Sequence, residues 1–191
     1  MKVILASTSA YRRSLLERLH LPFEVDRPEA DETPLPGEHP ADTANRLAVA
    51  KARAVADRHP AALVIGSDQV AHLGDEQFGK PGNRARAIAQ LQHMSGQTVV
   101  FHTAIALINT ATGSIRQDSV PTLVRFRTLT CDEIERYVDK EQPFDCAGSA
   151  KSEGLGITLL DALSGDDPTA LIGLPLIALS RMLRAEGVAL P

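Results

Sequence analysis

The segment Ala62–Leu73 constrains the fold most, because it is apolar and β-branched enough to form a central strand of a sheet. Before it, the chain alternates between strand and helix patterns. Strands are predicted at Lys2–Ala6 and Phe23–Asp26, and helices at Ala10–Leu19, with Ser9 as N-cap, and at Asp42–Arg58. A proline-rich loop, residues 28–40, separates the second strand from the second helix.

After the central strand, the pattern predicts a helix capped by Asn83 and a long antiparallel pair, Thr98–Ile108 with Ser114–Arg127. Pro121 is expected at a bulge or an edge of that pair. Later elements are a helix with a Thr130/Glu133 capping box, a strand at Gly156–Leu163 and a last helix with Pro175 at its first position. Together these elements predict an α/β fold with a mixed twisted sheet flanked by helices.

Composition bounds the class of protein. The 191 residues are 43% hydrophobic and 23% charged, which is typical of a globular chain, and one domain over residues 1–191 is expected. Two small lobes sharing a cleft would also fit this length. The net charge of −4 argues against a nucleic-acid partner bound through bulk charge.

The location is expected to be cytoplasmic. No stretch approaches about 18 uninterrupted apolar residues, so no membrane span is predicted. The apolar run Val3–Ala6 is too short for the core of a signal peptide. Cys131 and Cys146 form no metal-ligand set, which favours a reducing compartment.

The start of the first helix is unusual, because Arg12 and Arg13 lie where the helix dipole disfavours cations. An anion bound there reverses that preference, since backbone N–H groups and guanidinium groups can both point at it. Arg13 has a simpler explanation as a partner of Glu17. Arg12 lies on the face that should meet the core, and we interpret it as part of a phosphate site.

Two further residues stand out because charge interrupts an apolar pattern. Lys51 falls in the middle of the apolar stripe of its helix, where it either extends to solvent or points into a cleft. Asp68 follows a buried strand and must therefore be paired, bind a metal or have a raised pKa. Strand alternation places Asp68 and Gln69 on opposite faces, so the strand must bend or end if both serve one site.

Three other segments offer groups for a polyanion. Residues 74–80 match the P-loop pattern GxxxxGK, but Pro81 stands where Ser or Thr is required, so only Lys80 is retained as an isolated cation. Lys151 and Glu153 lie in a run of small residues, which permit close backbone approach to a ligand. The loop carboxylates Glu29, Asp31 and Glu32 are either solvated or metal ligands. This set suits a triphosphate with a divalent cation.

With these motifs in order, the chain resembles the Maf (septum-formation inhibitor-like) nucleotide pyrophosphatases over essentially its whole length. The resemblance rests on the segments LASTSAYRRSLLERL, PEADETP, IGSDQV, GKP, CAGSAKSEG and IGLPL. It implies an α/β fold with a cleft between two lobes, a cytoplasmic hydrolase, and cleavage of a nucleoside triphosphate to monophosphate and pyrophosphate with Mg²⁺ or Mn²⁺. A homodimer is expected from the resemblance alone.

Carried over by position, the resemblance implies roles for individual residues. Asp68 looks like the proton acceptor and, with Glu32, a metal ligand. The positions that match phosphate contacts are Ser7, Arg12, Lys51, Lys80 and Lys151.

Three positions resemble the branch that acts on 7-methyl-GTP, namely Tyr11, Gln69 and Glu153. N7-methylation makes guanine cationic, so an aromatic ring attracts it and a carboxylate balances its charge. Tyr11 is a smaller platform than the Trp expected in that branch. The alternatives are a dTTP/UTP pyrophosphatase of the same family, or a nucleotide-binding regulator of cell division without catalytic activity.

Overall fold

The computed structural model describes residues 1–191 and confirms an α/β fold with five α-helices and seven strands. The strands are β1 (Lys2–Ala6), β2 (Phe23–Asp26), β3 (Ala62–Leu73), β4 (Glu76–Phe78), β5 (Thr98–Asn109), β6 (Ser114–Phe126) and β7 (Leu160–Ser164). The helices are α1 (Ala10–Glu17), α2 (Pro40–Ala56), α3 (Arg84–Met94), α4 (Cys131–Glu141) and α5 (Leu176–Ala185), with short 3-10 helices η1 (Ala147–Ser149) and η2 (Leu155–Leu159).

The sheet is mixed, as predicted. Its strand order is β2-β1-β3-β5-β6-β7, and β4 pairs with β3. β1 is parallel to β2 and to β3, whereas the β3–β4 and β6–β7 pairs are antiparallel. The pairing of β6 with β7 extends from Leu123 to Phe126. Pro121 lies outside this ladder, so its missing N–H removes no hydrogen bond from it.

The chain forms two compact units. The first comprises residues 1–69, 103–120 and 167–191, and the second comprises residues 70–102 and 121–166. The strands β3, β5 and β6 each contribute residues to both units. A single domain over residues 1–191 stays a prediction.

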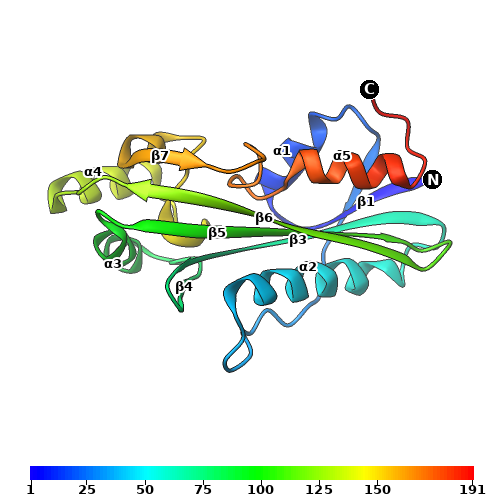
Figure 1. Ribbon diagram of the computed structural model, residues 1–191, viewed down its shortest axis with the longest axis horizontal. Coiled ribbons are helices and arrows are strands. Elements are labelled where there is room, and N and C mark those ends of the chain that lie inside the picture. The colour runs from blue at the N-terminus through cyan, green and yellow to red at the C-terminus, as the bar shows by residue number, and fades with distance from the viewer. The chain divides into compact units, whose positions relative to one another are not determined.

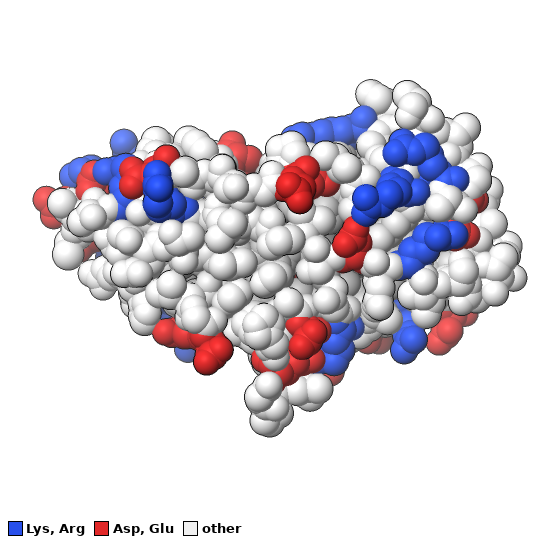
Figure 2. All heavy atoms as spheres, in the orientation of Figure 1, with Lys and Arg blue, Asp and Glu red and all other residues white.

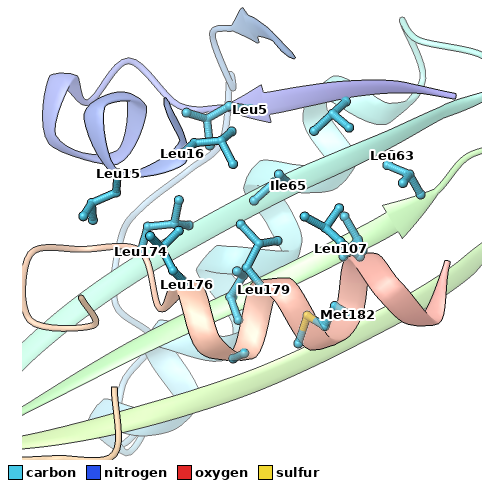
Figure 3. Close-up of a cluster of buried hydrophobic side chains, with 14 residues drawn as sticks. Leu5, Leu15, Leu16, Leu63, Ile65, Leu107, Leu174, Leu176, Leu179 and Met182 are labelled. Atoms are coloured by element: carbon cyan, nitrogen blue, oxygen red, sulfur yellow. The ribbon is translucent and has the colours of Figure 1, made fainter. Parts of the chain in front are cut away.

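The core of the first unit lies between one face of the sheet and the helices α1 and α5. Figure 3 shows Leu63 and Ile65 of β3 among leucines of α1, β1, β5 and α5, and these two β3 residues are fully buried. α2 covers the opposite face of the sheet (Figure 1). Because side chains alternate along a strand, the odd-numbered β3 residues of this unit, such as Leu63 and Ile65, face α5, and the even-numbered ones, such as Gly66, face α2.

Local sequence explains where most helices begin. Ser9, Asn83 and Thr130 cap α1, α3 and α4 through their side chains, as predicted. α2 begins two residues earlier than predicted, at Pro40, because proline fits the first turn of a helix and the His39 side chain accepts a hydrogen bond from Ala41 N. α1 ends at Glu17 rather than Leu19.

The predicted strand at Gly156–Leu163 is wrong in its first half. Residues 155–159 form η2, and the strand begins only at Leu160. Gly156 N donates to Lys151 O at 3.1 Å, and a Cβ at Gly156 would lie 2.5 Å from that oxygen. The chain therefore turns tightly here, which an apolar pattern cannot reveal.

The last helix begins at Leu176, one residue later than predicted, with Pro175 in the N-cap position. Pro175 has no side-chain acceptor. Instead, Thr169 Oγ1 accepts from Leu176 N at 2.8 Å and Asp167 Oδ2 accepts from Ile177 N at 2.7 Å. A carboxylate at a helix N-terminus is also favoured by the helix dipole.

Gly66 allows α2 to approach β3 closely. A Cβ at this position would lie 2.2 Å from Ala48 O and 2.7 Å from Ala52 N, both backbone atoms of α2. We predict that Gly66→Ala lowers the free energy of unfolding by about 3 kcal/mol, because α2 must move to admit the methyl group. Urea denaturation measures this change.

Gly79→Ala is the matched control, since no atom lies within 4 Å of a Cβ there. It should change stability by less than about 0.5 kcal/mol. Equal stability of the two variants would contradict the close approach at Gly66.

Candidate active site

Lys51 is a buried cation held between two carboxylates. It belongs to α2, and only 6% of the residue is exposed. Its Nζ lies 2.6 Å from Asp68 Oδ1 and 3.1 Å from Glu32 Oε2. Lys51 therefore does not extend to solvent. It contacts one carboxylate of the sheet and one of the acidic loop, the segment that carries Glu29, Asp31 and Glu32.

Asp68 lies inside β3, and 6% of the residue is exposed. The sequence required that such a carboxylate be paired, metal-bound or raised in pKa, and the structure shows pairing with Lys51. Gly66 lies two residues before Asp68, on the same face of β3. Because it has no side chain, α2 can approach the sheet closely there, which brings Lys51 near Asp68.

Arg12 connects the start of α1 with the loop before α5, which comprises residues 165–175. Its Nε donates to Gly173 O at 2.8 Å. Burial lowers the pKa of the Arg12 guanidinium, while the nearby charges of Asp68 and Glu32 raise it. The first turn of α1 has no acidic residue to neutralise Arg12. Arg13 is instead exposed and pairs with Glu17 at 3.1 Å, which explains it without a ligand.

Ser7 and Tyr11 flank the same helix start. Ser7 is buried, and its Oγ accepts a hydrogen bond from Ser9 N at 3.1 Å, so this hydroxyl shapes the turn into α1. Tyr11 is half-buried and precedes Arg12 in the first turn. Both residues therefore lie in the same short segment as the Arg12 guanidinium.

Gln69 faces away from the Lys51–Asp68 pair. β3 continues to Leu73, so the strand does not end between Asp68 and Gln69. Gln69 Nε2 lies 2.9 Å from Thr103 Oγ1 and 2.9 Å from Leu171 O. The structure thus places Gln69 against the loop before α5, on the face that strand alternation predicts.

The remaining predicted residues, Lys80, Lys151 and Glu153, belong to the second unit. Lys80 is exposed and follows β4, which forms a hairpin with β3, so residues 74–80 do not lead directly into a helix as a P-loop does. Glu153 is also exposed.

Lys151 is held by α4. Its Nζ lies 3.0 Å from Glu141 Oε1, and its backbone N donates to the Tyr137 hydroxyl at 3.0 Å. Burial raises the pKa of Tyr137, and a hydrogen bond from Leu155 N lowers the pKa of Glu141. The positive charge of Lys151 is therefore paired with a carboxylate of α4.

Sequence reasoning missed the ion pair that holds the acidic loop. Arg46 of α2 donates to both carboxylate oxygens of Glu38 at 2.7 Å, and to Thr33 O at 3.2 Å. Thr33 directly follows Glu32, so this pair fixes the backbone next to a predicted metal ligand. Its only sequence signal is an Arg on the helix that follows a Glu-containing loop.

No group of three or more metal-ligating side chains gathers in residues 1–191. Within the acidic loop, Glu32 is the carboxylate that reaches Lys51. Glu32 and Asp68 remain the two carboxylates available for one cation. Two is a sufficient number for Mg²⁺, which in nucleotide sites binds through one or two carboxylates together with substrate phosphates.

The surface carries mixed charge. On the face shown in Figure 2, both acidic and basic side chains are present. None of the helices combines the length and the apolar character that crossing a bilayer requires.

Comparison with known proteins assigns the family. Residues 2–186 match the family described as Maf-like protein. The chain is 74% identical to the 7-methyl-GTP pyrophosphatase of Aromatoleum aromaticum, over 100% of this chain and 98% of the relative. It is 61% identical to the 7-methyl-GTP pyrophosphatase of Thiobacillus denitrificans, over 97% and 92% of the two chains. The chain therefore belongs to the Maf family, as its motifs indicated.

The Arg46–Glu38 pair makes a prediction about acid stability. The Arg46 hydrogen bonds lower the pKa of Glu38 to about 2. A carboxyl group with a lowered folded-state pKa contributes stability above its unfolded pKa of about 4.3 and loses that contribution as the pH falls toward its folded pKa. Glu38→Gln should therefore be less stable than wild type at pH 6, and the gap should close between about pH 4.5 and 2.

Urea midpoints of both proteins across this pH range measure the gap. Glu24→Gln serves as the control, because Glu24 makes only an exposed pair with Lys2 and such pairs contribute little. A gap for Glu38→Gln that is independent of pH would contradict the prediction.

Proposed function

We propose that this protein is a 7-methyl-GTP pyrophosphatase, which hydrolyses 7-methyl-GTP to 7-methyl-GMP and pyrophosphate and so removes a modified nucleotide from the pool. The observation that carries the proposal is the buried Lys51 between Asp68 and Glu32. Both carboxylates also interact electrostatically with the Arg12 guanidinium. Identity of 74% to a relative named for this activity supports the substrate.

Arg12 and Lys51 bind the phosphates. Arg12 uses Nε for Gly173 O, which leaves its two terminal nitrogens for phosphate oxygens. An ammonium has three N–H donors, so Lys51 can hold both carboxylates and still donate to a phosphate oxygen. The start of α1, with Ser7, adds the positive end of a helix dipole.

Glu32 and Asp68 hold a divalent cation, Mg²⁺ or Mn²⁺. Their shared contact with Lys51 keeps the two carboxylates close together, and oxygen ligands are the kind these cations prefer. When bound, the cation supplies charge neutralisation on the phosphate oxygens.

Asp68 accepts the proton of the attacking water. Water attacks the α-phosphorus, the bond from that phosphorus to the bridging oxygen of the β-phosphate breaks, and the water proton passes to Asp68. Lys51 fixes the carboxylate from one side, at 2.6 Å. Arg12 and Lys51 hold the departing pyrophosphate, whose negative charge grows as the bond breaks.

The remaining contacts are Lys80 and Lys151 to phosphate and Glu153 to the base. Tyr11 stacks on the cationic 7-methylguanine, and Gln69 meets another edge of the base. We further propose that residues 1–191 act as one domain, that the protein forms a homodimer and that it is cytoplasmic.

The first test is Asp68→Asn. Turnover of 7-methyl-GTP should fall about 10³-fold, because the proton acceptor is lost, while 7-methyl-GTP binding measured by calorimetry stays within about threefold. Asp26→Asn is the matched control, since Asp26 also pairs with basic side chains, Arg58 and His59, but outside the site. Wild-type turnover in Asp68→Asn would remove Asp68 from the mechanism.

A substrate panel tests the base contacts. Pyrophosphate release from 7-methyl-GTP should exceed release from GTP, dTTP and UTP, and Glu153→Gln should reduce that preference by about tenfold because the variant no longer balances the charge of the base. Preferred turnover of dTTP or UTP by wild type would assign the protein to the other branch of the family. Binding of all four without turnover would favour a nucleotide-binding regulator.

A further inference from the structure

The loop before α5 gathers side chains from three other elements. Gly173 O accepts from Arg12 Nε of α1 at 2.8 Å and from Ser67 Oγ of β3 at 3.0 Å. A short stretch of loop backbone therefore anchors a proposed phosphate ligand and the strand that carries Asp68.

The same loop fixes the amide of Gln69. Gln69 Nε2 lies 3.2 Å from Ala170 O and 2.9 Å from Leu171 O. Carbonyl oxygens only accept hydrogen bonds, so the nitrogen of the amide, and not its oxygen, must face the loop. Gln69 Oε1 is then the atom left for any ligand, and it can only accept.

Thr103 of β5 completes this arrangement. It is fully buried, and its Oγ1 donates to Ala170 O at 2.8 Å. With its proton committed to that carbonyl, the hydroxyl accepts from Gln69 Nε2 at 2.9 Å. Thr103 thus holds both the amide and the carbonyl that the amide also contacts.

The loop is itself tied to α5 by side chains. Asp167 Oδ1 accepts from Thr169 N at 2.9 Å, while Asp167 Oδ2 and Thr169 Oγ1 accept the first N–H groups of α5. Asp167 is buried, with 3% of the residue exposed. The carbonyls that contact Gln69 therefore belong to a loop that two side chains tie to the start of α5.

We propose that Thr103 is a positioning residue for base recognition: with the carbonyls of Ala170 and Leu171, it fixes the Gln69 amide so that Oε1 accepts a hydrogen bond from a donor on the base. This inference rests on the proposed function. It fits 7-methylguanine, whose ring N1–H and exocyclic amino group are donors. Thr103 acts only through Gln69, so its loss affects binding of the base and not the chemistry at phosphorus.

Thr103→Val tests the proposal, because valine keeps the shape and removes the hydroxyl. KM for 7-methyl-GTP should rise about tenfold, as the loss of one buried hydrogen bond implies, with kcat within twofold. Inhibition by pyrophosphate, which lacks a base, should be unchanged. Thr103→Ser, which keeps the hydroxyl, should restore KM to within twofold of wild type.

Two comparisons separate positioning from a general structural role. Thr122→Val is the matched control, since Thr122 is also a buried strand threonine but its Oγ1 has no hydrogen-bond partner. In a Gln69→Leu background, Thr103→Val should add nothing, because the residue through which it acts is gone. An unchanged KM in Thr103→Val, or a full additional loss in the Gln69→Leu background, would overturn the proposal.

A readout without substrate distinguishes this proposal from the proposed function. The side-chain NH₂ signals of Gln69, identified by their loss in Gln69→Leu, should exchange slowly with solvent in wild type and at least tenfold faster in Thr103→Val. If wild type does not hydrolyse 7-methyl-GTP, the proposed function fails, and these signals alone decide whether Thr103 fixes the amide. Equal exchange in both proteins would show that it does not.

Discussion

The site depends on one buried ion pair, between Lys51 Nζ and Asp68 Oδ1. A buried ammonium or carboxylate without a partner is strongly destabilising, so each of these two residues requires the other for the fold. The pair also depends on Gly66, because a side chain there would push α2 away from β3. A backbone contact thus sets the distance between two charges, and Glu32 joins them from a loop that Arg46 holds in place.

The alternation of β3 divides the site into two chemical environments. Asp68 faces α2 and its cation, whereas Ser67 and Gln69 face the carbonyls of the loop before α5. Arg12 links these environments, since it bonds that loop and is also influenced by the charge of Asp68. A nucleotide has the same division, because its phosphates need cations and its base needs directional hydrogen bonds. Under the proposed function, the two faces of β3 would meet these two requirements separately.

The sequence predicted features that depend on local pattern, including the bounds of β3 and the caps of α1 and α3. It left open whether Lys51 extends to solvent or is buried, and the structure shows that it is buried. It did not predict which partners these residues have. The Lys51–Asp68 contact spans 17 positions and the Arg12–Gly173 contact spans 161, and no periodicity encodes such distances. The strand predicted at Gly156–Leu163 failed in its first half for a local reason, because the chain turns back on the Lys151 backbone five positions earlier. No sequence pattern singled out Asp167 and Thr169, because they accept hydrogen bonds from the first N–H groups of α5 over seven to ten positions.

The charges of the site explain why the proposed reaction needs more than the first unit provides. Arg12 and Lys51 contribute two positive charges, and Glu32 and Asp68 two negative ones, so the formal charge of this group is zero. A neutral group cannot hold a triphosphate by net charge, although its donors can orient one. Lys151 adds little net charge while Glu141 is paired with it, whereas Lys80 is exposed. The divalent cation proposed for Glu32 and Asp68 would change this balance most, because it would offset the two carboxylates and leave the positive charges of Arg12 and Lys51 uncompensated for the proposed phosphate contacts.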